Sequence, residues 1–130
     1  MTYSIAARCE KSGAFGIAIT SSSICVASRC AWVGPLGAVS TQNITDPALG
    51  PAGLALLRQG LGAGAVLDLL LAGTPQPDYR QVGVIDRYGM TALHSGKEAL
   101  PLAAFAQGPS CIALGMINTL ILLSPLVYWL

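Results

Sequence analysis

The first twenty residues contain two segments with the patterning of β-strands, joined by a short polar turn. Residues 2–8 alternate as a strand does, and residues 15–20 form a second candidate. The segment 10–13 between them is polar and ends in glycine, which is typical of a hairpin. This start restricts the chain to folds that contain an antiparallel sheet.

The remaining patterns predict strands, then two helices, then strands. Helices are expected at residues 53–59, with Pro51 in the first turn, and at 63–71. Residues 24–28 fit either a strand or a loop. Three further strands are expected, at residues 37–42, 80–86 and 90–95. This order indicates a layered α+β domain.

Composition excludes several classes of function. The chain has 130 residues, enough for one domain, with 10% charged residues and a net charge of +1. The charges are scattered singly, so nucleic-acid binding is not expected. Four cysteines match no zinc spacing and there is one histidine, so we expect neither a metal site nor a cofactor. The start does not resemble a signal peptide, and we expect reduced thiols and a cytoplasmic location.

The C-terminal part of the sequence is apolar and uncharged. Residues 112–130 are nineteen positions without a charge, close to the length of a membrane span. Polar residues within this stretch and the absence of flanking Lys or Arg favour a buried helix or an aberrant terminus. A tail anchor is the less favoured alternative, so we expect no membrane association.

Thr2 is the candidate nucleophile. A small residue behind Met1 permits removal of the methionine, which leaves an α-amine beside the Thr2 hydroxyl as its base. The alternative is an ordinary start. Ser21, Ser22 and Ser23 end the second strand and fall near Thr2 if the hairpin forms. Their hydroxyls would orient a substrate or hold the amine, or would simply face water.

Four further residues are candidates for substrate binding. Arg29 can clamp a carboxylate, or can lie over the nearby Trp32 as packing. Gln42 and Asn43 follow a strand and can read a polar substrate or line an oxyanion site, or can serve as turn residues. His94 ends a strand, where a lone histidine is more often a surface or core residue.

Motifs along most of the chain carry a resemblance to a known family. They include 2–9, 15–19, 21–23, 29–33, 37–43, 46–50, 53–54, 56–57, 59–60, 79–81 and 95–96. Over about residues 2–115, the chain resembles the family known as domain of unknown function 1028. The resemblance implies a fold similar to the N-terminal-nucleophile hydrolases, an αββα sandwich with two sheets between helix layers. It also favours Thr2 as the nucleophile, with backbone N–H groups or Asn43 holding the oxyanion.

The chain departs from that family's pattern after Gly115. We therefore expect an incomplete domain over residues 1–115, with the C-terminal part of the fold missing or replaced by a divergent apolar tail at 116–130. A frameshifted or truncated reading frame is our hypothesis for this change. The exposed apolar surface would be hidden by the tail or by another subunit, so we expect a homo-oligomer.

The leading functional hypothesis is hydrolysis of a small amide by an N-terminal threonine. The expected partner is therefore a small-molecule substrate. The alternative is a non-catalytic assembly or binding module that self-associates through apolar surface, because some members of the family carry the label of fimbrial assembly proteins.

Overall fold

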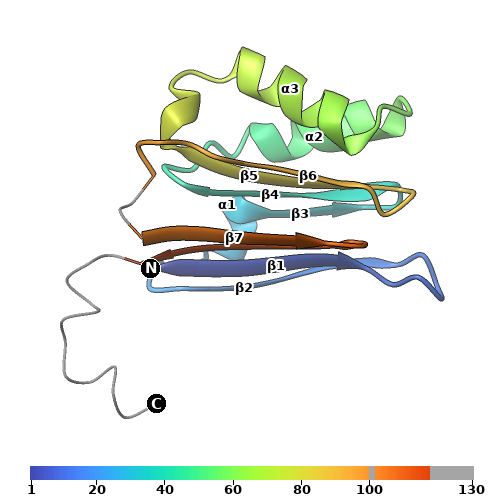
Figure 1. The fold of residues 1–130 in the computed structure, drawn as a ribbon, viewed down its shortest axis with the longest axis horizontal. Coiled ribbons are helices and arrows are strands. Elements are labelled where there is room, and N and C mark those ends of the chain that lie inside the picture. The colour runs from blue at the N-terminus through green and yellow to red at the C-terminus, as the bar shows by residue number, and fades with distance from the viewer. Residues whose placement is uncertain (100–101, 118–130) are drawn as a thin grey trace, which may run out of the picture.

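Two four-stranded antiparallel sheets stack face to face (Figure 1). The computed structural model describes residues 1–99 and 102–117. Sheet 1 has the order β2-β1-β8-β7, formed by Phe15–Ser21, Thr2–Arg8, Cys111–Ile117 and Leu102–Gly108. Sheet 2 has the order β3-β4-β5-β6, formed by Ala31–Gly34, Gly37–Asn43, Arg80–Asp86 and Thr91–Ser95.

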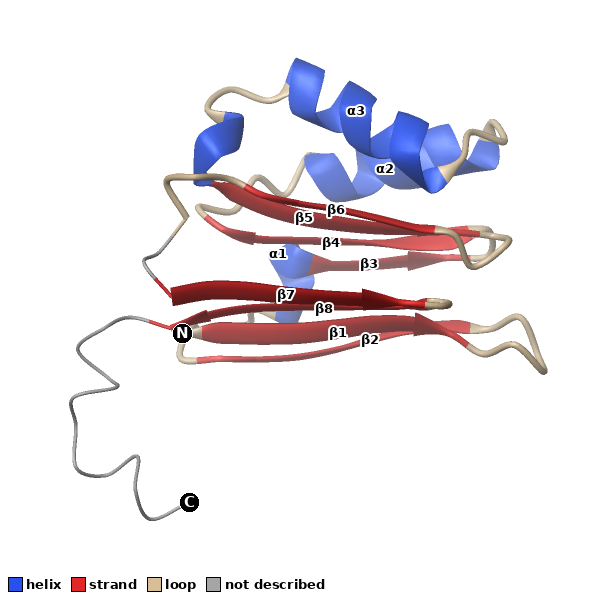
Figure 2. Cartoon of the chain, in the orientation of Figure 1, coloured by secondary structure: helices blue, strands red, loops and turns tan. Residues whose placement is uncertain are grey.

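Two helices, α2 (Leu49–Arg58) and α3 (Ala63–Gly73), lie on the outer face of sheet 2 (Figure 2). The short helix α1 (Ala27–Cys30) precedes β3, and a 3₁₀ turn, η1 (Pro77–Tyr79), precedes β5. Within the described residues no helix covers the outer face of sheet 1. The α+β class is therefore confirmed, but the described part has three layers where the expected αββα sandwich has four.

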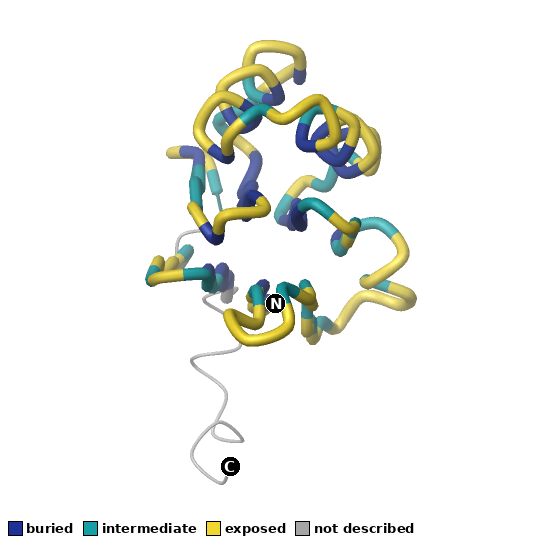
Figure 3. The backbone as a smooth tube through the Cα atoms, turned by 90° about the vertical axis from the view of Figure 1, so that its right-hand side faces the viewer, coloured by how far each residue is buried: buried dark blue, intermediate teal, exposed yellow. Residues whose placement is uncertain are grey.

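Side chains on β5 alternate between the two interfaces of sheet 2, because successive residues of a strand point to opposite faces. Val82 and Val84 pack under the helices, while Ile85 packs between the sheets. The core under the helices also contains Val39, Leu49, Leu54, Leu57, Ala63, Val66, Leu67 and Leu70. In Figure 3, buried backbone (dark blue) is present both in the helix layer and in the strands of the sheet next to it.

The interface between the sheets is apolar at one end and polar at the other. Ala6, Ile85 and Ile112 form a buried apolar cluster. Toward the start of β1, a row of hydrogen bonds crosses from sheet 1 to sheet 2. We call this row, made of Ser4, Gln42, Gln81 and Ser95, the glutamine network. It places polar atoms in a core position, where each of them needs a partner.

Asp86, the last residue of β5, organises two neighbouring segments. One carboxylate oxygen accepts a hydrogen bond of 3.1 Å from the backbone N–H of Ala63, at the start of α3. The other oxygen accepts from the backbone N–H groups of Tyr88 and Met90, at 2.9 and 3.0 Å. The negative charge thus lies at the positive end of the helix dipole and also holds the β5–β6 turn.

Most of the elements predicted from the sequence are present. The β1–β2 and β5–β6 hairpins, β4, α2 and α3 are confirmed, with α2 beginning at Leu49 rather than at residue 53. Residues 24–28 are not a strand, and their last two residues begin α1. The patterns missed β3, β7 and β8.

The prediction of a buried helix over residues 112–130 is wrong for its first part. Residues 112–117 belong to β8, which pairs with both β1 and β7. The predicted boundary after residue 115 falls inside this strand, and the rest of the predicted tail, residues 118–130, lies outside the described residues. Among the helices of the described part, none has the length and apolar character needed to span a membrane.

Candidate functional site

A cavity of about 260 Å³ lies where β1 begins and where β2 and β4 end. We call it the Thr2 cavity. Sheet 1 contributes residues from the paired ends of β1 and β2, and sheet 2 contributes the end of β4. The segment leading into α1 completes the wall. Its lining is Thr2, Ser21, Ser23, Val26, Arg29, Cys30, Gln42, Asn43 and Thr45.

Thr2 faces Ser21 across the β1–β2 pair, and the two side-chain oxygens lie 2.9 Å apart. The Ser21 hydroxyl donates to the Met1 carbonyl oxygen at 3.0 Å. Since a serine hydroxyl has one proton to donate, Thr2 is the donor in its bond to Ser21. The Ser22 backbone N–H also donates to the Met1 carbonyl, at 3.3 Å. The Met1 carbonyl oxygen therefore accepts two hydrogen bonds.

Gln42 and Asn43 bring the end of β4 to the cavity. Gln42 is 1% exposed, and both ends of its amide are bonded within the glutamine network. Asn43 has a left-handed backbone, with φ of 77°, and its side-chain N–H donates to the Tyr79 carbonyl oxygen at 2.6 Å. Asparagine tolerates this conformation better than most residues. Both side chains are thus held in place by other elements before any ligand binds.

Among the described residues that line the Thr2 cavity, Arg29 is the only one with a charged side chain. Its Nη1 donates to the Ile24 carbonyl oxygen at 3.2 Å, which ties the guanidinium to the preceding loop. The ion pair found in residues 1–99 and 102–117 joins Lys97 to Asp78 and does not involve Arg29. Because none of the described lining residues carries a carboxylate, the guanidinium lies among neutral hydroxyl and amide groups.

The structure brings together six of the eight residues predicted to form the site, namely Thr2, Ser21, Ser23, Arg29, Gln42 and Asn43. Ser22 lies next to the cavity, with its Oγ 3.5 Å from the Met1 amine. His94 does not belong to the lining, and its Nε2 lies 3.0 Å from the Pro77 carbonyl oxygen. The chemical roles assigned to these residues stay predictions.

Sequence reasoning missed Val26, Cys30 and Thr45 as lining residues. Cys30 is buried, and its sulfur lies 3.5 Å from the Thr45 hydroxyl oxygen. The sequence feature that could have identified Cys30 as a lining residue is its position directly after Arg29. Trp32, which is close to Arg29 in the sequence, packs against Gly50 of α2, where a Cβ on the glycine would collide with the indole ring. In the described ranges, no group of His, Cys, Asp and Glu is placed to hold a metal ion.

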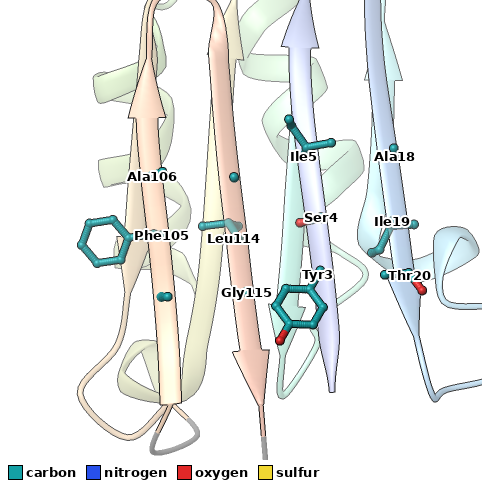
Figure 4. Close-up of a pocket in the computed structure, with 12 residues that line it drawn as sticks. Tyr3, Ser4, Ile5, Ala18, Ile19, Thr20, Phe105, Ala106, Leu114 and Gly115 are labelled. Atoms are coloured by element: carbon teal, nitrogen blue, oxygen red, sulfur yellow. The ribbon is translucent and has the colours of Figure 1, made fainter. Parts of the chain in front are cut away.

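A second, apolar surface lies on the outer face of sheet 1 (Figure 4). It forms an open groove of about 570 Å³. The Tyr3 ring lies across Gly115 of the neighbouring strand, because the glycine has no side chain to occupy that space. On this face, Tyr3 and Ile5 remain 38% and 46% exposed. We call this surface the sheet 1 outer face.

Comparison with known proteins identifies the family. The model of DUF1028, a family of unknown function, matches residues 2–121. The chain belongs to this family. A crystal structure of a DUF1028 protein from Silicibacter pomeroyi superposes with a TM-score of 0.83 and 26% sequence identity. The match covers 91% of this DUF1028 chain and 52% of that protein, so the chain spans about half of the relative's length.

No curated protein matches this DUF1028 chain. The family expected from the motifs is thus confirmed. The relation to N-terminal-nucleophile hydrolases stays a prediction, because neither match carries an activity.

Proposed function

We propose that this chain contributes the nucleophile of a hydrolase that cleaves a small amide, with Thr2 as the N-terminal nucleophile after removal of Met1. The observation that supports this proposal best is the Thr2 cavity itself. It places the Thr2 hydroxyl, a hydroxyl partner from β2, two ordered amides from β4 and one cation around a space of small-molecule size. Ligand pockets generally run from roughly 300 to 1,000 Å³, so a small substrate fits best.

In the proposed reaction, Thr2 Oγ1 attacks the carbonyl carbon of the amide while its proton passes to the Thr2 α-amine. The tetrahedral oxyanion accepts hydrogen bonds from backbone N–H groups or from the Asn43 side chain. The C–N bond then breaks, and the proton held by the α-amine goes to the leaving nitrogen. Water hydrolyses the resulting ester and restores the Thr2 hydroxyl.

The hydrogen bonds of Met1 support the proposal that its removal completes the site. Its carbonyl oxygen accepts from Ser21 Oγ and from the Ser22 N–H. Loss of Met1 frees both donors next to the new α-amine of Thr2. Ser21 Oγ, already 2.9 Å from Thr2 Oγ1, then lies close to both the nucleophile and its base. We infer that Ser21 positions the nucleophile.

The test combines intact mass with amide hydrolysis. We expect the mature chain to begin at Thr2, Thr2→Ala to abolish release of amine from a panel of small amides, and Thr2→Ser to retain measurable activity. Thr20→Ala, on the exposed side of β2, is the matched control and should leave the rate unchanged. Full activity of a chain that retains Met1, or of the Thr2→Ala variant, would refute the mechanism.

A second candidate function, self-association, is favoured by the sheet 1 outer face. A surface of four strands by seven residues measures roughly 19 by 23 Å, or about 440 Å². A single exposed apolar patch of roughly 300–600 Å² is often functional, so this face is a candidate for an interaction. Stable interfaces bury about 800 Å² per partner, so we propose a weak association with a second copy of the chain.

Sedimentation velocity over a concentration series tests this candidate. Ile5→Ser combined with Tyr3→Ser should shift the chain to monomer, whereas Val33→Ser, which is 47% exposed on sheet 2, should not. A chain that stays monomeric at every concentration would exclude self-association.

A further inference from the structure

The charge of the Thr2 cavity points to a class of substrate. We propose that Arg29 binds a carboxylate on the substrate, so that the reaction acts on small amides that also carry a carboxylate group. This inference rests on the proposed amide hydrolysis and specifies its substrate. It starts from the combination of one cationic side chain and no carboxylate among the nine lining residues that the structure describes.

Arg29 is anchored in a way that leaves donors for a ligand. Its side chain is partly buried, and Nη1 is bonded to the Ile24 carbonyl oxygen. Nη2 and Nε make no hydrogen bond within residues 1–99 and 102–117. A guanidinium held at one nitrogen loses little further freedom when its other nitrogens bind a planar carboxylate.

The rest of the lining argues against a cationic or purely neutral substrate. The other polar side chains are hydroxyls, amides and a thiol, and none of them supplies the negative charge that an ammonium group would need. A neutral ligand would displace water from the Arg29 guanidinium without supplying an anion to interact with it. Partial removal of a cation from water is unfavourable unless an anion or strong acceptors replace the water.

The size of the cavity limits the molecule that can carry this carboxylate. About 260 Å³ lies below the range of most ligand pockets. Arg29 and Thr2 line the same small space, so the carboxylate and the scissile amide must lie within a few bonds of each other. Acylated amino acids and half-amides of short dicarboxylic acids have this arrangement.

Binding to the full chain with Thr2→Ala tests the inference without the chemistry. Titrations followed by NMR compare two charge pairs: N-acetylglycine with N-acetylglycinamide, and succinamate with succinamide. We expect at least one carboxylate to bind about tenfold or more tightly than its neutral partner, because a charged hydrogen-bonded pair contributes more than a neutral one. Adding Arg29→Gln should remove this preference and leave the neutral partner's affinity unchanged.

The controls separate a binding role of Arg29 from a structural role. Arg58→Gln changes an exposed arginine at the end of α2 and should leave the preference intact. Arg29→Lys retains the charge and should retain part of the preference, which shows that loss in Arg29→Gln does not come from unfolding. Equal affinities within both pairs, absence of binding by both carboxylates, or a preference that survives Arg29→Gln would each overturn the inference.

Hydrolysis of the same four amides by the chain with Thr2 intact distinguishes this inference from the proposed function. Equal cleavage of charged and neutral amides overturns the carboxylate preference alone. Carboxylate binding that depends on Arg29, without cleavage of any amide, overturns the hydrolase and supports an anion-binding site.

Discussion

Replacement of Gln42 by leucine tests whether the glutamine network holds the two sheets together. Gln42 Oε1 accepts from Ser4 Oγ at 2.8 Å, and its Nε2 donates to Gln81 Oε1 at 2.9 Å. Leucine has a similar volume, so the substitution leaves little empty space but removes both hydrogen bonds. Ser4 still has the Ser40 hydroxyl at 3.2 Å, whereas Gln81 Oε1 loses its donor.

The expected cost follows from the acceptor left unpaired. Gln81 is 0% exposed, so water does not replace the missing donor. A buried polar group without a partner costs about 1–3 kcal/mol, and we expect Gln42→Leu to lower the free energy of unfolding by about 2 kcal/mol. In the double variant with Gln81→Leu, neither amide remains to be unpaired. The double variant should therefore lose less free energy of unfolding than the two single variants lose in total, by about 1 kcal/mol or more.

Urea unfolding measured by circular dichroism gives these free energies from the midpoint and slope of each transition. Gln59→Leu, at an exposed position after α2, serves as the control and should stay within about 0.5 kcal/mol of the unmodified chain. A Gln42→Leu variant as stable as that control would show that the network contributes nothing. Strict additivity of the two single variants would show that the amides do not act as a pair.

Two further predictions concern packing and thiol chemistry. A Cβ on Gly83 would lie 2.4 Å from Ile112 Cδ1, so Gly83→Ala should lower the free energy of unfolding by about 1–3 kcal/mol, and Ile112→Val should recover part of that loss in urea unfolding. The pKa of Cys9 is lowered chiefly by the hydrogen bond from the Ser12 side chain. Because Ser12→Ala removes this stabilisation of the thiolate, half-maximal alkylation of Cys9, followed by peptide mass spectrometry, should move to higher pH; an unchanged midpoint would contradict the assignment.

Local patterns predicted the elements whose partners are close in sequence. The β1–β2 and β5–β6 hairpins each depend on a short turn, and α2 and α3 depend on apolar spacing over a few residues. The strands β7 and β8 were missed because the charge-free composition after Glu98 hides the alternation that marks a half-buried strand. Only pairing with β1, about a hundred residues earlier, identifies β8 as an inner strand of sheet 1.

In the candidate site too, some contacts follow from local sequence patterns and others depend on the tertiary structure. The proximity of Thr2 to Ser21 follows from the hairpin, since an antiparallel pair brings the start of one strand to the end of the other. The approach of Arg29, Gln42 and Asn43 does not follow from any local rule. It requires sheet 2 to stack on sheet 1 with the end of β4 over the start of β1.

The sequence by itself determined the hairpins, the two helices, the family and most of the polar residues that surround the cavity, because these depend on short-range patterns and on motifs. The tertiary structure decided which of them meet. It excluded His94 from the Thr2 cavity and added Cys30 and Thr45 to it. It also placed Asp86 against the start of α3. These contacts arise from the stacking of layers, which brings together residues far apart in the chain.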